Sequence, residues 1–64
     1  MNNFKENLKT YRKQSDMTQK ELAEKLEVTV NNIGHWEKGR TEPNLDTLVK
    51  MTQIFNITLD ELIK

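Results

Sequence analysis

The sequence predicts an all-α protein, a compact five-helix orthogonal bundle that forms a single domain over residues 1–64. Two observations lead to this class. Apolar residues recur at three- and four-residue spacing in several stretches, which is typical of amphipathic helices. Capping patterns and turn residues separate these stretches, so each helix is short. Short, local elements favour crossing helices in a bundle over one long coiled coil.

The first helix is predicted over residues 3–14, because Phe4, Leu8 and Tyr11 fall on one face. Ser15 and Asp16 end it.

The second and third helices are predicted over residues 19–26 and 30–37, joined by a tight turn. Thr18 and Glu21 have the spacing of a capping box, in which each side chain bonds the other's backbone amide. The buried face of residues 19–26 consists of Leu22, Ala23 and Leu26. Thr29 caps the next helix, whose buried residues are Ile33 and Trp36.

Two further positions define how residues 30–37 end and pack. Gly39 is suited to the left-handed conformation that closes a helix. Trp36 lies one turn from Ile33, which favours a place in the core over an exposed stacking platform for single-stranded nucleic acid.

The last two helices follow a loop at residues 40–43, where Pro43 keeps Glu42 extended. Asn44 caps the fourth helix, and Thr58 with Glu61 forms a capping box for the fifth. The inward residues expected on these two helices are Leu45, Leu48, Val49, Thr52, Phe55, Leu59 and Leu62.

Composition excludes several classes of protein. The chain has no cysteine and one histidine, so we expect no disulfide, metal site or cofactor, and no enzyme. No apolar run approaches the ~18 residues of a membrane span, and the N-terminal residues lack the apolar core of a signal peptide. We therefore expect a cytoplasmic protein without a membrane partner.

The charges are unevenly distributed. Ten basic and ten acidic residues give a net charge of zero. Residues 1–15, however, contain four basic residues and one acidic residue, a net of +3, whereas residues 16–27 contain two and four, a net of −2. The first helix and the loop with Lys38 and Arg40 are therefore candidates to face phosphate, with the acidic segments turned away.

The outer face predicted for residues 30–37 is short, polar and free of acidic side chains from Val30 to His35. Such a face suits insertion into the major groove of DNA. Asn31 has the geometry to bond both adenine N6 and N7, and Val30 can contact a thymine methyl group. His35 can donate to guanine or phosphate. Gly34 has two open interpretations, close approach of backbone to DNA or an unselected small residue.

A longer pattern connects these features to a known family. The segments TQKELAEKLEVT, I-x-x-WEKGRTEPNLDTL and I-T-L-D-E-L resemble the helix-turn-helix of the lambda repressor and Cro-like family, also called the Xre family. The resemblance extends over residues 4–63. It implies a lambda repressor-like DNA-binding domain with residues 19–26 and 30–37 as the helix-turn-helix.

From their position and chemistry, Val30, Asn31 and His35 are expected to contact bases. The resemblance implies roles for further residues. Arg12 and Glu37 are expected to form a structural ion pair in preference to a phosphate contact by Arg12. Glu27 departs from the family, which usually has glycine there, so a left-handed turn would be strained by about 1 kcal/mol. The residues expected to contact the DNA backbone are Gln19, Thr29, Asn32, Lys38, Arg40 and Thr41.

The expected function is sequence-specific binding of double-stranded DNA by a small bacterial or phage transcriptional repressor. Two copies would bind a pseudo-palindromic operator as a homodimer, which forms either in solution or on DNA. Met51, Ile54 and Ile63 are apolar beyond the needs of the expected core, which suggests either a dimer contact or a wider core stripe. The alternatives are an antitoxin or other protein-interaction module, and a fragment of a longer regulator. We expect no small-molecule ligand.

Overall fold

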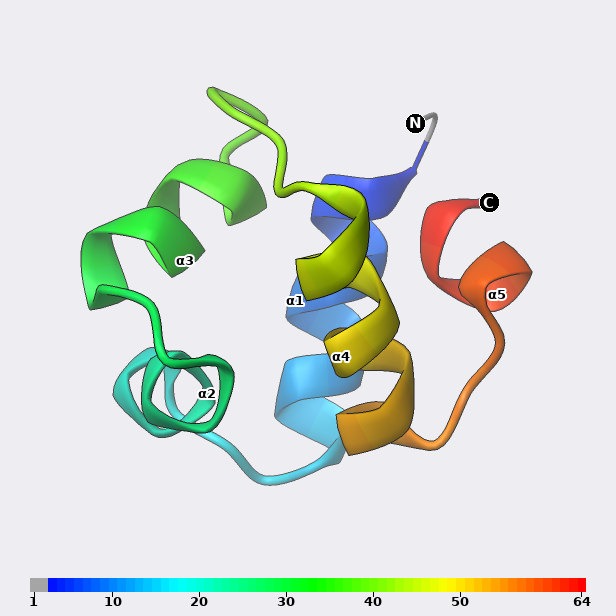
Figure 1. Cartoon of the computed structure of the whole chain (residues 1–64), viewed down its shortest axis with the longest axis horizontal. Coiled ribbons are helices and arrows are strands. Elements are labelled where there is room, and N and C mark those ends of the chain that lie inside the picture. The colour runs from blue at the N-terminus through cyan, green and yellow to red at the C-terminus, as the bar shows by residue number, and fades with distance from the viewer. Residues whose placement is uncertain (1–2) are drawn as a thin grey trace.

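A computed structural model describes residues 3–64; residues 1–2, which belong to the predicted domain, lie outside this range. Five helices follow one another, α1 (Phe4–Gln14), α2 (Gln19–Leu26), α3 (Val30–Glu37), α4 (Leu45–Phe55) and α5 (Leu59–Ile63) (Figure 1). The all-α, five-helix prediction is confirmed, and the bounds of α2 and α3 are those expected from the sequence. α1 begins one residue later than predicted.

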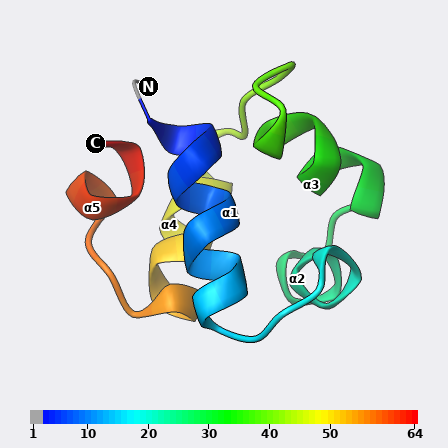
Figure 2. The same cartoon turned by 180° about the vertical axis from the view of Figure 1, so that it is seen from behind.

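The helices lie around a central pair. α1 and α4 form the middle of the molecule, α2 and α3 lie on one side of it, and α5 lies on the other (Figures 1 and 2). α3 packs on α1 and α2, and α5 packs on α1 and α4. α1 therefore packs on the inner side of the helix-turn-helix, and the opposite side faces outward.

One apolar core joins all five helices. Leu8, Leu22, Ile33, Met51 and Leu62, one from each helix, have no exposed surface. Trp36 is 6% exposed, which confirms its prediction as a core residue. Burial of large apolar side chains is the main stabilising contribution in a domain of this size.

α4 is rotated relative to the orientation predicted from its sequence. Its buried residues are Leu48, Met51 and Phe55, whereas Leu45 is 64% and Val49 42% exposed. The prediction that Leu45 and Val49 point inward is wrong, and the burial of Met51 agrees with the wider core stripe and contradicts a dimer contact by this residue. Both stripes are apolar at helical spacing, and the core formed by α1, α2 and α5 selects the one that contains Met51.

Among residues 3–64, left-handed backbone occurs at Asp16, Glu27, Gly39 and Asn56. Glu27 has φ 59° and ψ 41°, and the Val28 amide donates to the Ala23 carbonyl at 3.0 Å, so the strained turn predicted for Glu27 is present. Gly39 has φ 74°, as expected for a residue that closes α3. A residue with a Cβ is disfavoured in this conformation.

Two side-chain amides, from Asn7 of α1 and from Asn3 just before it, bond the end of the chain at α5. The Asn7 amide nitrogen donates to the Leu62 carbonyl at 3.0 Å, and the Asn3 amide nitrogen donates to the Lys64 carbonyl at 2.7 Å. The last carbonyls of a helix lack intrahelical partners. The bond from Asn7 satisfies one of them, and the two bonds together join the two ends of the described chain.

Candidate nucleic-acid interface

α3 is fixed by its cap and by two buried side chains. The Thr29 hydroxyl accepts from the Asn32 amide at 3.2 Å, as predicted for an N-cap. Ile33 and Trp36 anchor the inner side of the helix in the core. Their burial leaves the other side of α3 free of packing and turned away from α1.

The outer side of α3 holds the residues predicted to read DNA. Val30, Asn31, Asn32 and His35 are all exposed, and Val30 is 45% exposed. A Cβ added at Gly34 would meet no atom within 4 Å, so the fold itself does not require glycine there. This face contains no acidic residue, lysine or arginine. A surface of this kind can lie in a groove lined by base edges.

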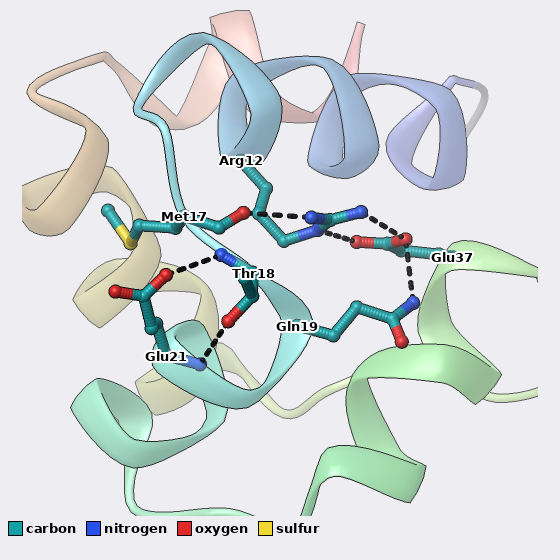
Figure 3. Close-up of polar contacts among 6 residues, drawn as sticks. All are labelled: Arg12, Met17, Thr18, Gln19, Glu21 and Glu37. Atoms are coloured by element: carbon teal, nitrogen blue, oxygen red, sulfur yellow. Dashed lines mark hydrogen bonds and ion pairs between the residues drawn. The ribbon is translucent and has the colours of Figure 1, made fainter.

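Glu37 and Arg12 form the ion pair predicted from the resemblance. Arg12 Nε donates to Glu37 Oε2 at 2.6 Å, and a terminal guanidinium nitrogen donates to Oε1 at 3.2 Å (Figure 3). The two side chains are 10% and 5% exposed. A second guanidinium nitrogen donates to the Met17 carbonyl at 2.8 Å. The pair therefore connects α1, the α1–α2 loop and the end of α3, which makes it structural.

Gln19 joins this cluster. Its amide nitrogen donates to Glu37 Oε1 at 3.1 Å, and the residue is half-buried (Figure 3). Gln19 is thus more than a solvated first residue of α2. The bond holds the N-terminus of α2 against the C-terminus of α3, a relationship that the sequence did not reveal. Its amide nitrogen carries a second N–H that can donate to a phosphate oxygen, and the predicted contact to the DNA backbone stays a proposal.

The N-terminus of α2 is closed by the predicted capping box. The Thr18 amide donates to Glu21 Oε1 at 2.9 Å, and the Glu21 amide donates to the Thr18 hydroxyl at 3.1 Å (Figure 3). The hydrogen bond from the Thr18 backbone, followed by that from its side chain, lowers the pKa of Glu21 below its ordinary value of 4.5. The box fixes where α2 begins beside the candidate interface.

The loop after α3 presents the remaining predicted contacts. Lys38, Arg40 and Thr41 are exposed. The Arg40 amide donates to the His35 carbonyl at 2.9 Å, so the backbone of the loop is tied to the last turn of α3. The two cationic side chains consequently extend from a fixed turn at the end of the candidate reading helix.

The structure adds Lys5 to this region. A Cβ placed on Gly39 would approach Lys5 Cδ to 2.9 Å, so the lysine side chain lies across the glycine. The sequence showed that the first helix is basic. It did not show which lysine meets the loop, because that depends on how α1 and α3 cross.

Among residues 3–64, no group of three or more histidine, cysteine, aspartate or glutamate side chains is placed to hold a metal ion. No helix in this part of the chain is long and apolar enough to cross a membrane.

Comparison with known proteins agrees with the geometry. A family model described as helix-turn-helix matches residues 8–62. The HTH-type transcriptional regulator ImmR of Bacillus subtilis is 39% identical over 88% of this chain and 44% of its own length. The HTH-type transcriptional activator BcrR of Enterococcus faecalis is 38% identical over 94% of this chain and 29% of its own length. The chain thus spans less than half of either relative.

A solved structure has the same fold. The SOS-response transcriptional repressor LexA from Eubacterium rectale superposes with a TM-score of 0.88 and 33% identity, over 95% of this chain and 65% of that one. The five-helix fold, with α3 exposed on its outer side, defines a helix-turn-helix domain. With the match over residues 8–62, the chain belongs to the Cro/C1-type, or Xre, helix-turn-helix family of DNA-binding transcriptional regulators.

Proposed function

We propose that this chain binds double-stranded DNA sequence-specifically, with α3 in the major groove. The observation that supports this most directly is the combination of a buried inner side of α3, at Ile33 and Trp36, with an exposed outer side free of acidic residues. Asn31 lies on that outer side, where a bidentate bond to adenine is possible. Val30 and His35 flank it as further base contacts.

The backbone contacts in this proposal surround α3. Thr29 and Asn32 are at its start, and Lys38, Arg40 and Thr41 follow its end. Gln19 adds the N-terminus of α2, where the helix dipole and backbone amides favour a phosphate. These positions match a helix that enters the groove while its neighbours touch the two flanking strands.

The direct test is selection of bound duplexes from a random DNA pool. We expect enrichment of one short motif, repeated as an inverted pair. The same selection with the Asn31→Ala variant is the matched control, because the substitution removes one candidate base contact from an exposed position. Recovery of unenriched DNA by the wild-type protein would refute sequence-specific binding and favour the alternative, a protein-interaction module.

The regulatory effect we propose is repression by operator occupancy. The LexA likeness supports this direction, whereas BcrR is named an activator. Transcription in vitro from a promoter that contains the selected motif distinguishes the two. We expect transcript levels to fall as protein is added, and a rise would contradict repression.

We further propose a two-fold dimer on DNA, with the two copies of α3 in successive major grooves about 34 Å apart. The predicted dimer contact needs revision, because Met51 is fully buried and cannot touch a second copy. Ile54 and Ile63 are half-buried and pack against the core. The exposed apolar side chains of α4 are Leu45 and Val49, so we place the contact there.

The charges next to Leu45 and Val49 suit a second copy of the same chain. Asp46 and Lys50 are exposed and one turn apart on α4. Across a two-fold axis, two antiparallel α4 helices can bring Asp46 of each copy near Lys50 of its partner. Val49→Lys should abolish cooperative binding to the paired motif, while Thr10→Lys, which adds the same charge to α1, should not. Cooperative binding by Val49→Lys would refute this surface.

A further inference from the structure

Lys5 and Gly39 make a contact between the start of α1 and the turn after α3. A Cβ on Gly39 would lie 2.9 Å from Lys5 Cδ, 3.8 Å from Cε and 3.7 Å from Nζ. The lysine chain therefore occupies the space that a side chain at position 39 would need. Gly39 also has a φ of 74°, which glycine adopts without strain.

This contact places the Lys5 ammonium beside the backbone of the turn that holds Lys38 and Arg40. The first turn of α1 and the loop after α3 lie at the same end of the molecule in both views (Figures 1 and 2). α1 and α3 also pack directly on each other. Lys5 thus lies beside a turn in which Lys38 and Arg40 are the chain neighbours of Gly39, at the C-terminal end of the candidate reading helix.

The neighbouring Glu6 does not neutralise the charge of Lys5. Its Nζ lies 4.0 Å from a Glu6 carboxylate oxygen, and the two side chains are 52% and 57% exposed. Exposed pairs of this kind contribute little and exchange readily with water. The acidic residue of the loop is Glu42. Lys5, Lys38 and Arg40 carry three positive charges against this one negative charge, so the cluster formed by these three residues is basic.

We propose that Lys5 is a DNA phosphate contact, and that Lys5, Lys38 and Arg40 together bind the backbone strand beside the groove that α3 enters. This inference rests on the proposed function. Its structural basis is the glycine at position 39, which leaves room for the lysine chain to lie on the turn between Lys38 and Arg40. A side chain at position 39 would displace Lys5 from the loop.

A purely structural role for Lys5 is the competing explanation. A cation near the C-terminus of a helix is favoured by the helix dipole, and Lys5 lies near the end of α3. That role predicts a lower melting temperature on removal of the charge and no change in DNA binding.

The test is the salt dependence of binding, measured on the duplex returned by the random-pool selection. Lys5→Met keeps most of the alkyl chain on Gly39 and removes the charge. Lys9→Met is the matched control, an exposed lysine on the same helix. Each phosphate contact contributes about 0.9 to the slope of log K against log salt. We expect Lys5→Met to lower the slope by about that amount, Lys9→Met to leave it unchanged, and Lys5→Met/Arg40→Ala to lower it by about twice as much.

The outcomes separate this inference from the proposed function. If Arg40→Ala lowers the slope and Lys5→Met does not, Lys5 is no phosphate contact, and a lower melting temperature for Lys5→Met would then assign it to the helix dipole. If Lys9→Met lowers the slope equally, the slope reports only the total charge of the protein. That result would refute the proposal that Lys5, Lys38 and Arg40 bind phosphate as a cluster. If no duplex is selected or bound, the proposed function fails first.

Discussion

The Arg12 guanidinium donates hydrogen bonds to both carboxylate oxygens of Glu37, at 2.6 and 3.2 Å. The side chain of Arg12 is 10% exposed and that of Glu37 is 5% exposed. The pair joins the first helix to the last residue of the candidate reading helix. Because Gln19 donates to the same carboxylate, the orientation of α2 relative to α3 depends on it as well.

Arg12→Ala should reduce the free energy of unfolding by about 3–5 kcal/mol, because it leaves the Glu37 charge buried without its partner. Arg12→Met/Glu37→Leu should lose less, since neither charge is then stranded. Denaturant titration measures both, and DNA binding should be assayed well below the melting temperature. A stable Arg12→Ala protein that binds DNA poorly would instead place Arg12 in the interface.

Asn31→Ala should weaken binding to the selected motif by about 1–3 kcal/mol and relax the preference at one base pair. The melting temperature should stay near that of the wild type, because Asn31 is exposed and forms no cap. Competition binding with the motif and with random duplex gives both quantities. Equal losses on the two DNAs would show that Asn31 reads no base.

Gly34→Ala should stabilise the free protein by about 0.5–1 kcal/mol, since alanine is the better helix former and its Cβ meets nothing within 4 Å. The same Cβ would project from the outer side of α3, so we expect weaker DNA binding. Thermal unfolding and a binding titration test the two parts. Unchanged affinity would mean that position 34 is simply a small residue with no role at the interface.

Glu27→Gly should stabilise the protein by up to about 1 kcal/mol, because Glu27 is left-handed at φ 59° and glycine adopts that conformation without a Cβ clash. The contact from Lys50 to Glu27, at 4.0 Å with the glutamate 83% exposed, contributes little that would be lost. Asn56→Gly is the matched control at φ 57° and should gain less, since asparagine tolerates this region. Equal gains at both sites would argue against strain specific to Glu27.

Glu21 should make the stability of α2 depend on pH. Its pKa is lower in the folded protein than its ordinary value of 4.5, chiefly because the Thr18 amide donates to it. The stabilisation is therefore complete above that ordinary value and is lost as the pH falls through the lower folded value. The wild type should melt above Glu21→Gln at neutral pH, and the gap should shrink at acidic pH. Glu24→Gln gives the baseline for loss of one carboxylate from α2, and a gap independent of pH would contradict the prediction.

Local sequence determined where α2, α3, α4 and α5 begin. Each of these helices has an N-cap that bonds a residue three positions away, so the caps can be recognised in the sequence alone. They are Thr18 with Glu21, Thr29, Asn44, and Thr58 with Glu61. Of the four left-handed positions, Gly39 was expected from its residue type and Glu27 from the family resemblance, whereas Asp16 and Asn56 were not predicted.

Only the tertiary structure decided which residues meet across helices. α4 has two apolar stripes, and packing against the other helices buried Met51 and exposed Val49. The bond from Gln19 to Glu37 and the contact of Lys5 with Gly39 likewise join residues far apart in sequence. Helical periodicity fixes the spacing within a face, but the side of a helix that turns inward is set by the volume and direction of its partners.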